Sequence, residues 1–127
     1  SLASRGEPVK VFGDGNQSRE MTYVSDVVDA TAVALEAQPG SLPCAYNVGG
    51  GARTTVRELV RLVGEVMGER LEISHGPPVP GDVRSTWADL HQTTRELGYE
   101  PRVSLEEGIE AQVHWALAGH RAPSMAL

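Results

Sequence analysis

The chain has 127 residues, of which 40% are hydrophobic and 22% are charged, and its formal net charge is −6 at pH 7. This length is typical of one small domain with a single core, without room for a second, cofactor-binding lobe. The acidic balance and the lack of a run of Lys and Arg exclude a basic nucleic-acid surface, although one Arg can still hold a phosphate. We find no signal segment and no apolar run near 18 residues, so we expect a soluble, cytoplasmic protein outside the membrane.

The first third of the chain predicts two strands and a helix. Residues 9–12 alternate and meet the glycine-rich residues 13–16, which indicates a short strand and a tight turn. Residues 21–24 are β-prone, and Ser25 then offers the N-cap of a helix that reaches Ala37 before a stop at Pro39-Gly40. The helical spacing predicts one buried face, formed by Val28, Ala32 and Leu35.

The middle of the chain predicts a strand, a helix and another strand. Residues 45–48 read as a buried strand that leads into the glycines at 49–51. Thr55 and Glu58 have the spacing of a capping box, which starts a helix that Gly68 ends. A short strand follows at 71–74, and residues 76–81 are rich enough in Pro and Gly to form a loop.

Two more helices complete the predicted fold. Asp89 can cap a brief helix that runs to Leu97. Ser104 begins a second capping box, and the helix behind it is predicted to bury Leu105, Ile109, Val113, Ala116 and Leu117. The pattern ends there, so we expect one lobe over residues 1–118 and a disordered tail over 119–127. The fold class is α+β, with about four helices and three or four short strands.

Composition and spacing alone predict no catalytic centre and no metal site. The four His residues lack zinc-binding spacing, no nucleophile elbow is present, and the lone Cys44 is expected to be a buried, inert thiol. The glycines at 13–15 lack the third glycine of a dinucleotide loop, because position 18 is Ser. The glycines at 49–51 precede a helix but lack a Walker lysine, so a structural connector is favoured over a phosphate cradle.

Two polar residues stand where a binding site could form. Arg19 lies between a glycine-rich turn and a β-prone segment, where a guanidinium can lean over a pocket and bind a phosphate with two hydrogen bonds. The alternative is a solvated Arg. Asp82 follows a Pro-Gly turn, where its carboxylate could accept sugar hydroxyls or simply bond its own backbone.

Taken together, these segments resemble the extended short-chain dehydrogenase/reductases, the NAD-dependent nucleotide-sugar epimerases and dehydratases such as UDP-glucose 4-epimerase. The segment VFGDGNQSREMTYVSDVV at 11–28 is similar to their "fGdGxqxRDfxYVxDv". In the same order follow YNVG at 46–49, GDVRSTWAD at 81–89, LGYEP at 97–101 and SLEEG at 104–108. The resemblance covers about residues 5–118 and identifies the chain as the carboxy-terminal part of such an enzyme.

The resemblance implies that the Rossmann domain and the carboxy-terminal part of such an enzyme have separate roles. In this family the Rossmann domain binds NAD and carries a Tyr-x-x-x-Lys pair. No segment of this sequence is similar to that domain or to that pair, so we expect the chain alone to bind no cofactor. The carboxy-terminal part binds the nucleotide sugar, with a UDP-sugar favoured. By this resemblance Val11 and Phe12 line the base site, Arg19 reaches the diphosphate and Asp82 meets the ribose.

The chain departs from the family pattern at three positions. Val79 stands where a second phosphate-binding Arg is often found, and Arg84 is the nearby cation that could replace it. Glu20 and Ser25 each stand where Asp is common. The Val79 departure leaves the nucleotide, the sugar and the geometry of diphosphate binding open.

The resemblance leaves three hypotheses. The first is the substrate-binding part of a 4-epimerase, which oxidises and re-reduces the sugar C4 with bound NAD. The others are a 4,6-dehydratase parent and a non-catalytic, stand-alone binding or interaction module. The expected partners are a nucleotide sugar and the missing Rossmann domain, without which an exposed apolar patch could let copies self-associate.

Overall fold

The computed structural model describes residues 6–37 and 45–119, which form four helices and four short strands in an α+β arrangement. This confirms the predicted fold class. The strands are β1 (Val9–Phe12), β2 (Ser18–Glu20), β3 (Arg53–Thr55) and β4 (Ile73–Gly76). The helices are α1 (Val24–Glu36), α2 (Val56–Met67), α3 (His91–Leu97) and α4 (Leu105–Leu117). The predictions for Cys44, for Pro39-Gly40 and for the tail beyond Gly119 lie outside the described residues.

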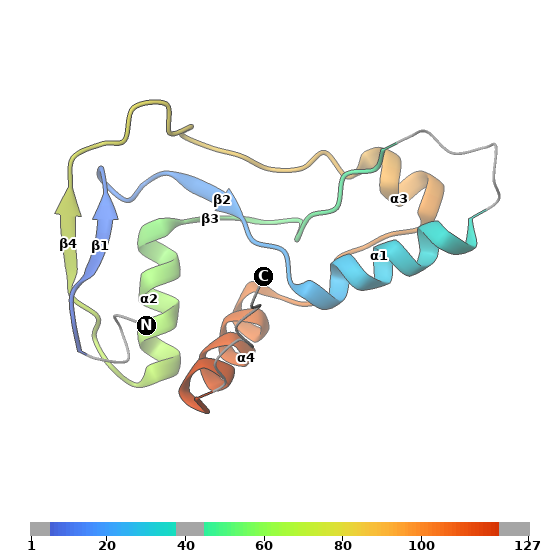
Figure 1. Cartoon of the computed structure of the whole chain (residues 1–127). Helices are drawn as coiled ribbons and strands as arrows, with labels where there is room; N and C mark the ends of the chain where they lie inside the picture. Colours follow the sequence, from blue (N-terminus) through green and yellow to red (C-terminus); the bar gives the residue numbers. More distant parts are fainter. Residues whose placement is uncertain (1–5, 38–44, 120–127) are drawn as a thin grey trace, which may run out of the picture.

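The strands form two separate pairs. β1 pairs in parallel with β4, in a register that runs from Val9 opposite Ile73 to Phe12 opposite Gly76. β2 pairs antiparallel with β3, which places Arg19 opposite Thr54. The β1–β4 pair lies beside α2, the β2–β3 pair crosses the middle, and α1 and α3 lie at the far end (Figure 1).

Helices α2 and α4 begin at the predicted N-caps, although only α4 has a complete capping box and α2 has the Thr55 half of one. The Thr55 hydroxyl accepts a hydrogen bond from the Glu58 amide at 3.1 Å, and Gly68 ends α2 in the left-handed conformation at φ 68°. Ser104 and Glu107 form a complete capping box at the start of α4. The two helices pack against each other and contribute Leu62 and Val113 to the core.

The predicted buried face of α4 is only partly correct. Leu105 and Ile109 are half-buried and Val113 is buried, whereas Ala116 and Leu117 are exposed. The packing against α2 therefore ends before the last turn of α4 among the described residues.

The predicted buried face of α1 is wrong. Val28, Ala32 and Leu35 are exposed, and the buried positions are Asp26 and Ala30. The Asp26 carboxylate accepts hydrogen bonds from the Arg102 and Val103 amides at 3.2 and 3.4 Å, which ties α1 to the segment before α4. Helical spacing defines the faces of a helix, but the tertiary neighbours decide which face is covered.

The predicted N-cap of α1, Ser25, is also wrong. Tyr23 holds the N-cap position and makes no side-chain cap hydrogen bond. Ser25 instead lies inside the first turn.

Two predicted strands shift along the chain. The second strand is Ser18–Glu20 in place of 21–24, and β4 starts at Ile73, two residues later than predicted. Strand ends are set by the partner strand, which the local sequence does not specify.

The predicted strand at 45–48 is wrong, because within the described residues this segment pairs with no strand. Side chains satisfy the carbonyls here in place of a strand ladder. The Thr93 hydroxyl donates to the Asn47 carbonyl at 2.6 Å, and the Tyr99 hydroxyl donates to the Gly49 carbonyl at 2.7 Å. Both donors are buried, so they fix this extended segment against α3 and its following loop.

Within the described ranges, no helix is both long enough and apolar enough to cross a membrane.

Candidate functional site

Two adjoining cavities lie between the β1–β2 turn and the loop after β4. The first measures about 250 Å³ and its walls include Asp14, Arg84 and Pro78. The second measures about 560 Å³ and reaches Lys10, Val11 and Val56. Both are lined by Phe12, Gln17, Val79 and Asp82. The structure therefore brings Val11, Phe12, Asp82 and Arg84 to one place, although Asp82 and Arg84 lie about 70 positions after β1 in the sequence.

The β1–β2 turn is built by two glycines and anchored on α2. Gly13 and Gly15 have φ angles of 72° and 74°, which favour glycine. The Gly15 and Gln17 carbonyls accept hydrogen bonds from the Arg57 and Val56 amides at 3.0 and 3.1 Å. The turn thus satisfies two of the free amides at the start of α2.

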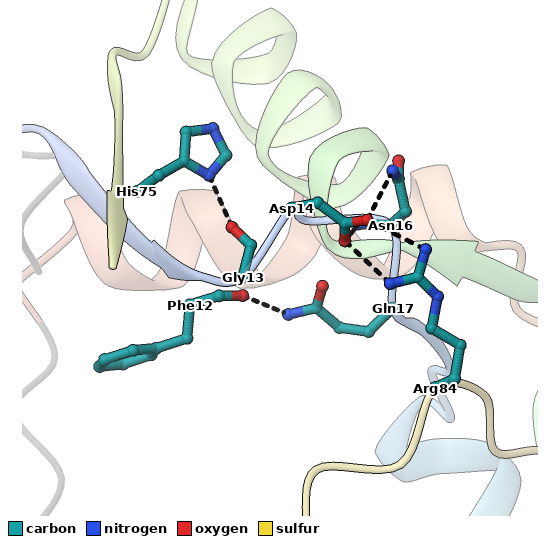
Figure 2. A network of polar contacts seen from close by, with 7 residues as sticks. All are labelled: Phe12, Gly13, Asp14, Asn16, Gln17, His75 and Arg84. Carbon is teal, nitrogen blue, oxygen red and sulfur yellow. Dashed lines mark hydrogen bonds and ion pairs between the residues drawn. The ribbon is translucent and has the colours of Figure 1, made fainter. Parts of the chain in front are cut away.

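Side chains hold the same turn from two sides (Figure 2). Nε2 of Gln17 donates to the Phe12 carbonyl at 2.9 Å. Nδ1 of His75, on β4, lies 2.8 Å from the Gly13 carbonyl oxygen. The Gln17 bond therefore closes residues 12–17 on themselves, and the His75 contact joins this cavity wall to β4.

Arg84 binds Asp14 through two hydrogen bonds. Nη1 and Nη2 each lie 3.0 Å from a carboxylate oxygen of Asp14, as Figure 2 shows. The Asn16 amide and side chain donate to the same carboxylate at 2.9 and 3.1 Å. The Arg84 hydrogen bond and then the Asn16 amide hold the pKa of Asp14 far below its ordinary value, because each stabilises the charged form.

Arg19 forms an ion pair with Asp82, and its Nη1 also donates to the Ser18 carbonyl at 2.8 Å. The Arg19 side chain is 26% exposed and that of Asp82 is 39% exposed. Arg19 does not itself line either cavity but reaches their shared wall through Asp82. Each predicted cation of this region is therefore paired with a carboxylate.

The two residues expected at a base site differ in exposure. Val11 is 3% exposed and belongs to the core, whereas Phe12 is 43% exposed. The Lys10 ammonium lies 5.0 Å from the centre of the Phe12 ring. Phe12 offers an apolar ring to both cavities, whereas Val11 borders only the second one.

The glycines at 49–51 act as a connector rather than an open anion cradle. The Gly51 amide donates to Oε1 of Glu20 at 2.7 Å, so a carboxylate already occupies it. The other oxygen of Glu20 accepts from the Ala88 amide at 2.5 Å. A Cβ on Gly50 would lie 2.0 Å from the Met21 carbonyl oxygen, which only glycine avoids.

Sequence reasoning missed Glu20, which it noted only as a departure from the family pattern. No local signal could have revealed its role, because its partners Gly51 and Ala88 lie 31 and 68 positions away in the sequence.

A third cavity, of about 830 Å³, lies beside Glu20 and was not predicted. The Arg53 guanidinium stacks over the Trp87 ring at 4.3 Å and donates to the Ser85 hydroxyl at 3.2 Å. These partners are more than 30 positions apart in the sequence, so local spacing gives no signal for them. In the part of the chain that the structure describes, no group of His, Cys, Asp or Glu could hold a metal ion.

A family model described as GDP-mannose 4,6 dehydratase matches residues 2–112. The chain belongs to the extended short-chain dehydrogenase/reductase family of NAD-dependent epimerases and dehydratases. It is 31% identical over 114 residues to UDP-glucuronate 4-epimerase of Thermodesulfobacterium geofontis, a match that covers 87% of this chain and 33% of that protein. The chain thus spans about a third of the length of the curated relatives it matches.

Solved structures of epimerases in this family have the same fold over nearly the whole chain. UDP-glucose 4-epimerase of Thermotoga maritima, solved with UDP-glucose, is 39% identical with a TM-score of 0.84, over 93% of this chain and 37% of that one. UDP-glucuronic acid 4-epimerase of Bacillus cereus, solved with UDP-glucuronic acid and NAD, is 28% identical with a TM-score of 0.87. That match covers 94% of this chain and 38% of the other.

Proposed function

We propose that the chain is the nucleotide-sugar-binding part of an NAD-dependent UDP-sugar 4-epimerase. The observation that carries the proposal is the pair of adjoining cavities, both lined by the exposed Phe12 and by Asp82. The Arg84–Asp14 pair lines the smaller cavity, and Arg19 reaches the shared wall through its ion pair with Asp82. A nucleoside diphosphate needs an apolar face for its base and cations for its phosphates. The similarity to epimerases solved with UDP-glucose and UDP-glucuronic acid supports the same ligand class.

Each residue of the proposed site has a role that its chemistry allows. Phe12 offers its exposed ring to the base, and the buried Val11 borders the second cavity. Arg19 donates a remaining guanidinium N–H to the diphosphate while it keeps its bonds to Ser18 and Asp82, and Asp82 accepts the ribose hydroxyls. Arg84 supplies the second cation, because Val79 has no charge to offer from the same cavity wall. Binding far from the reacting carbon then positions the sugar C4 for chemistry.

The described residues do not fit NAD. Ser18 stands where a dinucleotide loop needs its third glycine, and it opens strand β2 where that loop would open a helix. We therefore assign NAD, which accepts and returns the hydride at C4, to the two thirds of the relatives that this chain does not span. This part of the enzyme contributes substrate anchoring, and no step of hydride transfer is assigned to it.

Arg19→Ala in the complete enzyme tests the proposal. A charge-assisted hydrogen bond contributes about 1.5–3 kcal/mol, so we expect KM for the UDP-sugar to rise about 10- to 100-fold with a smaller change in kcat. Arg61→Ala is the control, because Arg61 is an exposed cation on α2 that pairs with Glu58 and Glu65. An unchanged KM for Arg19→Ala, with normal unfolding, would remove Arg19 from the site.

The second candidate is a 4,6-dehydratase parent, which the description of the matching family model favours. A dehydratase releases water from the sugar, whereas an epimerase returns a product of the same mass. Mass spectrometry of the product of the complete enzyme distinguishes the two.

The exposed apolar residues of α1 support a contact with the rest of the enzyme. They are Val24, Val27, Val28, Val33 and Leu35. A surface of this kind on a partial chain is expected to be covered by the Rossmann domain or, failing that, by a second copy. We expect the enzyme in the cytoplasm, because a reducing compartment suits a sequence with a single Cys.

A further inference from the structure

The Arg84–Asp14 pair lines the smaller cavity of the proposed site, and Arg84 is held less firmly than the other cation, Arg19. The Arg84 side chain is 68% exposed and that of Asp14 is 48% exposed. Arg19, by contrast, is 26% exposed and is also held by the Ser18 carbonyl. Of the two cations, Arg84 is therefore the one that can change partner with little loss of packing.

Asp14 keeps other partners when Arg84 leaves. The Asn16 amide and side chain both donate to its carboxylate, at 2.9 and 3.1 Å. These bonds lie within the β1–β2 turn, which Gly15 and Gln17 anchor on α2. Breaking the Arg84 contact leaves a solvated carboxylate with two donors, so the turn can keep its shape.

We propose that Asp14 is a releasable counter-ion that competes with the ligand for Arg84. In the empty site Asp14 holds Arg84, and on binding a phosphate of the nucleotide takes the place of the Asp14 carboxylate. Asp14, Arg84, Asp82 and Val79 line the same 250 Å³ cavity, so the exchange needs only a turn of the Arg84 side chain. The inference rests on the proposed function and adds that Asp14 lowers the affinity of the site for phosphate-bearing ligands.

The competition has a definite energetic form. A guanidinium can bind either a phosphate or a carboxylate with two hydrogen bonds, and a diphosphate carries more negative charge than one carboxylate. The exposed ion pair with Asp14 contributes little net stability, so the phosphate can displace it. The free energy gained when the phosphate binds Arg84 is nevertheless reduced by the free energy that the Arg84–Asp14 pair contributes in the empty site.

The test is calorimetric titration of the complete enzyme with UDP and with uridine, with dTDP and GDP run beside UDP. Asp14→Asn removes the charge but keeps a side-chain oxygen for the Asn16 amide. We expect it to tighten UDP by up to about fivefold, the equivalent of one exposed ion pair, and to leave uridine unchanged. Arg84→Gln should weaken UDP by about tenfold and also leave uridine unchanged.

The double variant makes the test specific. In the Arg84→Gln variant Asp14 has no guanidinium to hold away from the phosphate, so adding Asp14→Asn should no longer tighten the binding of UDP. Glu110→Gln is the control for net charge, because Glu110 is exposed on α4 and its loss changes the total charge equally. Tightening by Glu110→Gln to the same degree would show a general charge effect and overturn the proposal.

The outcomes separate this inference from the proposed function. Wild-type enzyme that binds none of the nucleotides overturns the proposed function and the competition with it. Wild-type enzyme that binds UDP, with an Asp14→Asn variant that binds it equally or more weakly, overturns only the competition. Equal changes for UDP and uridine would show that Asp14 merely shapes the turn.

Discussion

Glu20 joins two loops that are distant in the sequence, and its removal should be costly. Its carboxylate accepts the Gly51 amide at 2.7 Å and the Ala88 amide at 2.5 Å. Glu20→Ala leaves both donors without that acceptor. A hydrogen bond to a charged group contributes about 1.5–3 kcal/mol, and Glu20 is half-buried, so water can replace part of each bond. With the lower figure counted once for each of the two hydrogen bonds, we expect the free energy of unfolding to fall by about 3 kcal/mol.

Urea denaturation followed by circular dichroism measures this loss. With a slope near the middle of the usual range, about 1.5–2 kcal/mol/M, the unfolding midpoint should fall by about 1.5–2 M. Glu20→Gln keeps one acceptor oxygen and should lose about half as much. Glu110→Ala, at an exposed position of α4, is the control. A midpoint for Glu20→Ala equal to that of the control would refute the role of Glu20 in joining the loops.

Two further predictions concern single hydrogen bonds and their pH dependence. Tyr99→Phe leaves the buried Gly49 carbonyl without its donor and should cost about 1–3 kcal/mol in the same urea assay. Burial, then the charges of Asp26 and Glu20, raise the pKa of Tyr99 above its ordinary 10.0, so wild-type stability should fall above pH 10 and the cost should shrink there. Ser104→Ala should cost about 1 kcal/mol at pH 7. Hydrogen bonds from Ser104 lower the pKa of Glu107 below its ordinary 4.5, so this cost should diminish as acid protonates Glu107. A cost that stays constant while Glu107 becomes protonated would contradict the bond from the Ser104 hydroxyl to the Glu107 carboxylate.

The parts of the fold that depend on local chemistry could be predicted from the sequence. The start of α2 at Thr55 and its end at Gly68 follow from a hydroxyl and a glycine at fixed positions. The Ser104–Glu107 capping box is equally local, because both partners lie within one turn.

The parts that depend on distant partners could not be predicted. Residues 45–48 have the composition of a strand, but a strand exists only where a neighbour pairs with it. The error in the faces of α1 has the same origin. The Asp26 side of this helix is buried because its carboxylate binds amides 76 and 77 positions away, and the predicted face is left exposed.

The candidate site divides in the same way. The resemblance named Arg19, Asp82 and Arg84, but their pairing with one another and with Asp14 joins residues 63 and 70 positions apart. No spacing rule covers such distances. Glu20, equally, could be assigned a role only after the structure placed Gly51 and Ala88 beside it.

The attachment of the β1–β2 turn to α2 has a practical consequence for measurement. The carbonyls of Gly15 and Gln17 accept the hydrogen bonds of the Arg57 and Val56 amides. Any ligand that displaces the turn changes the length of these two bonds, and amide chemical shifts respond to such changes. In an NMR spectrum the Val56 and Arg57 resonances would therefore act as built-in reporters of the turn, readable in titrations with any unlabelled ligand.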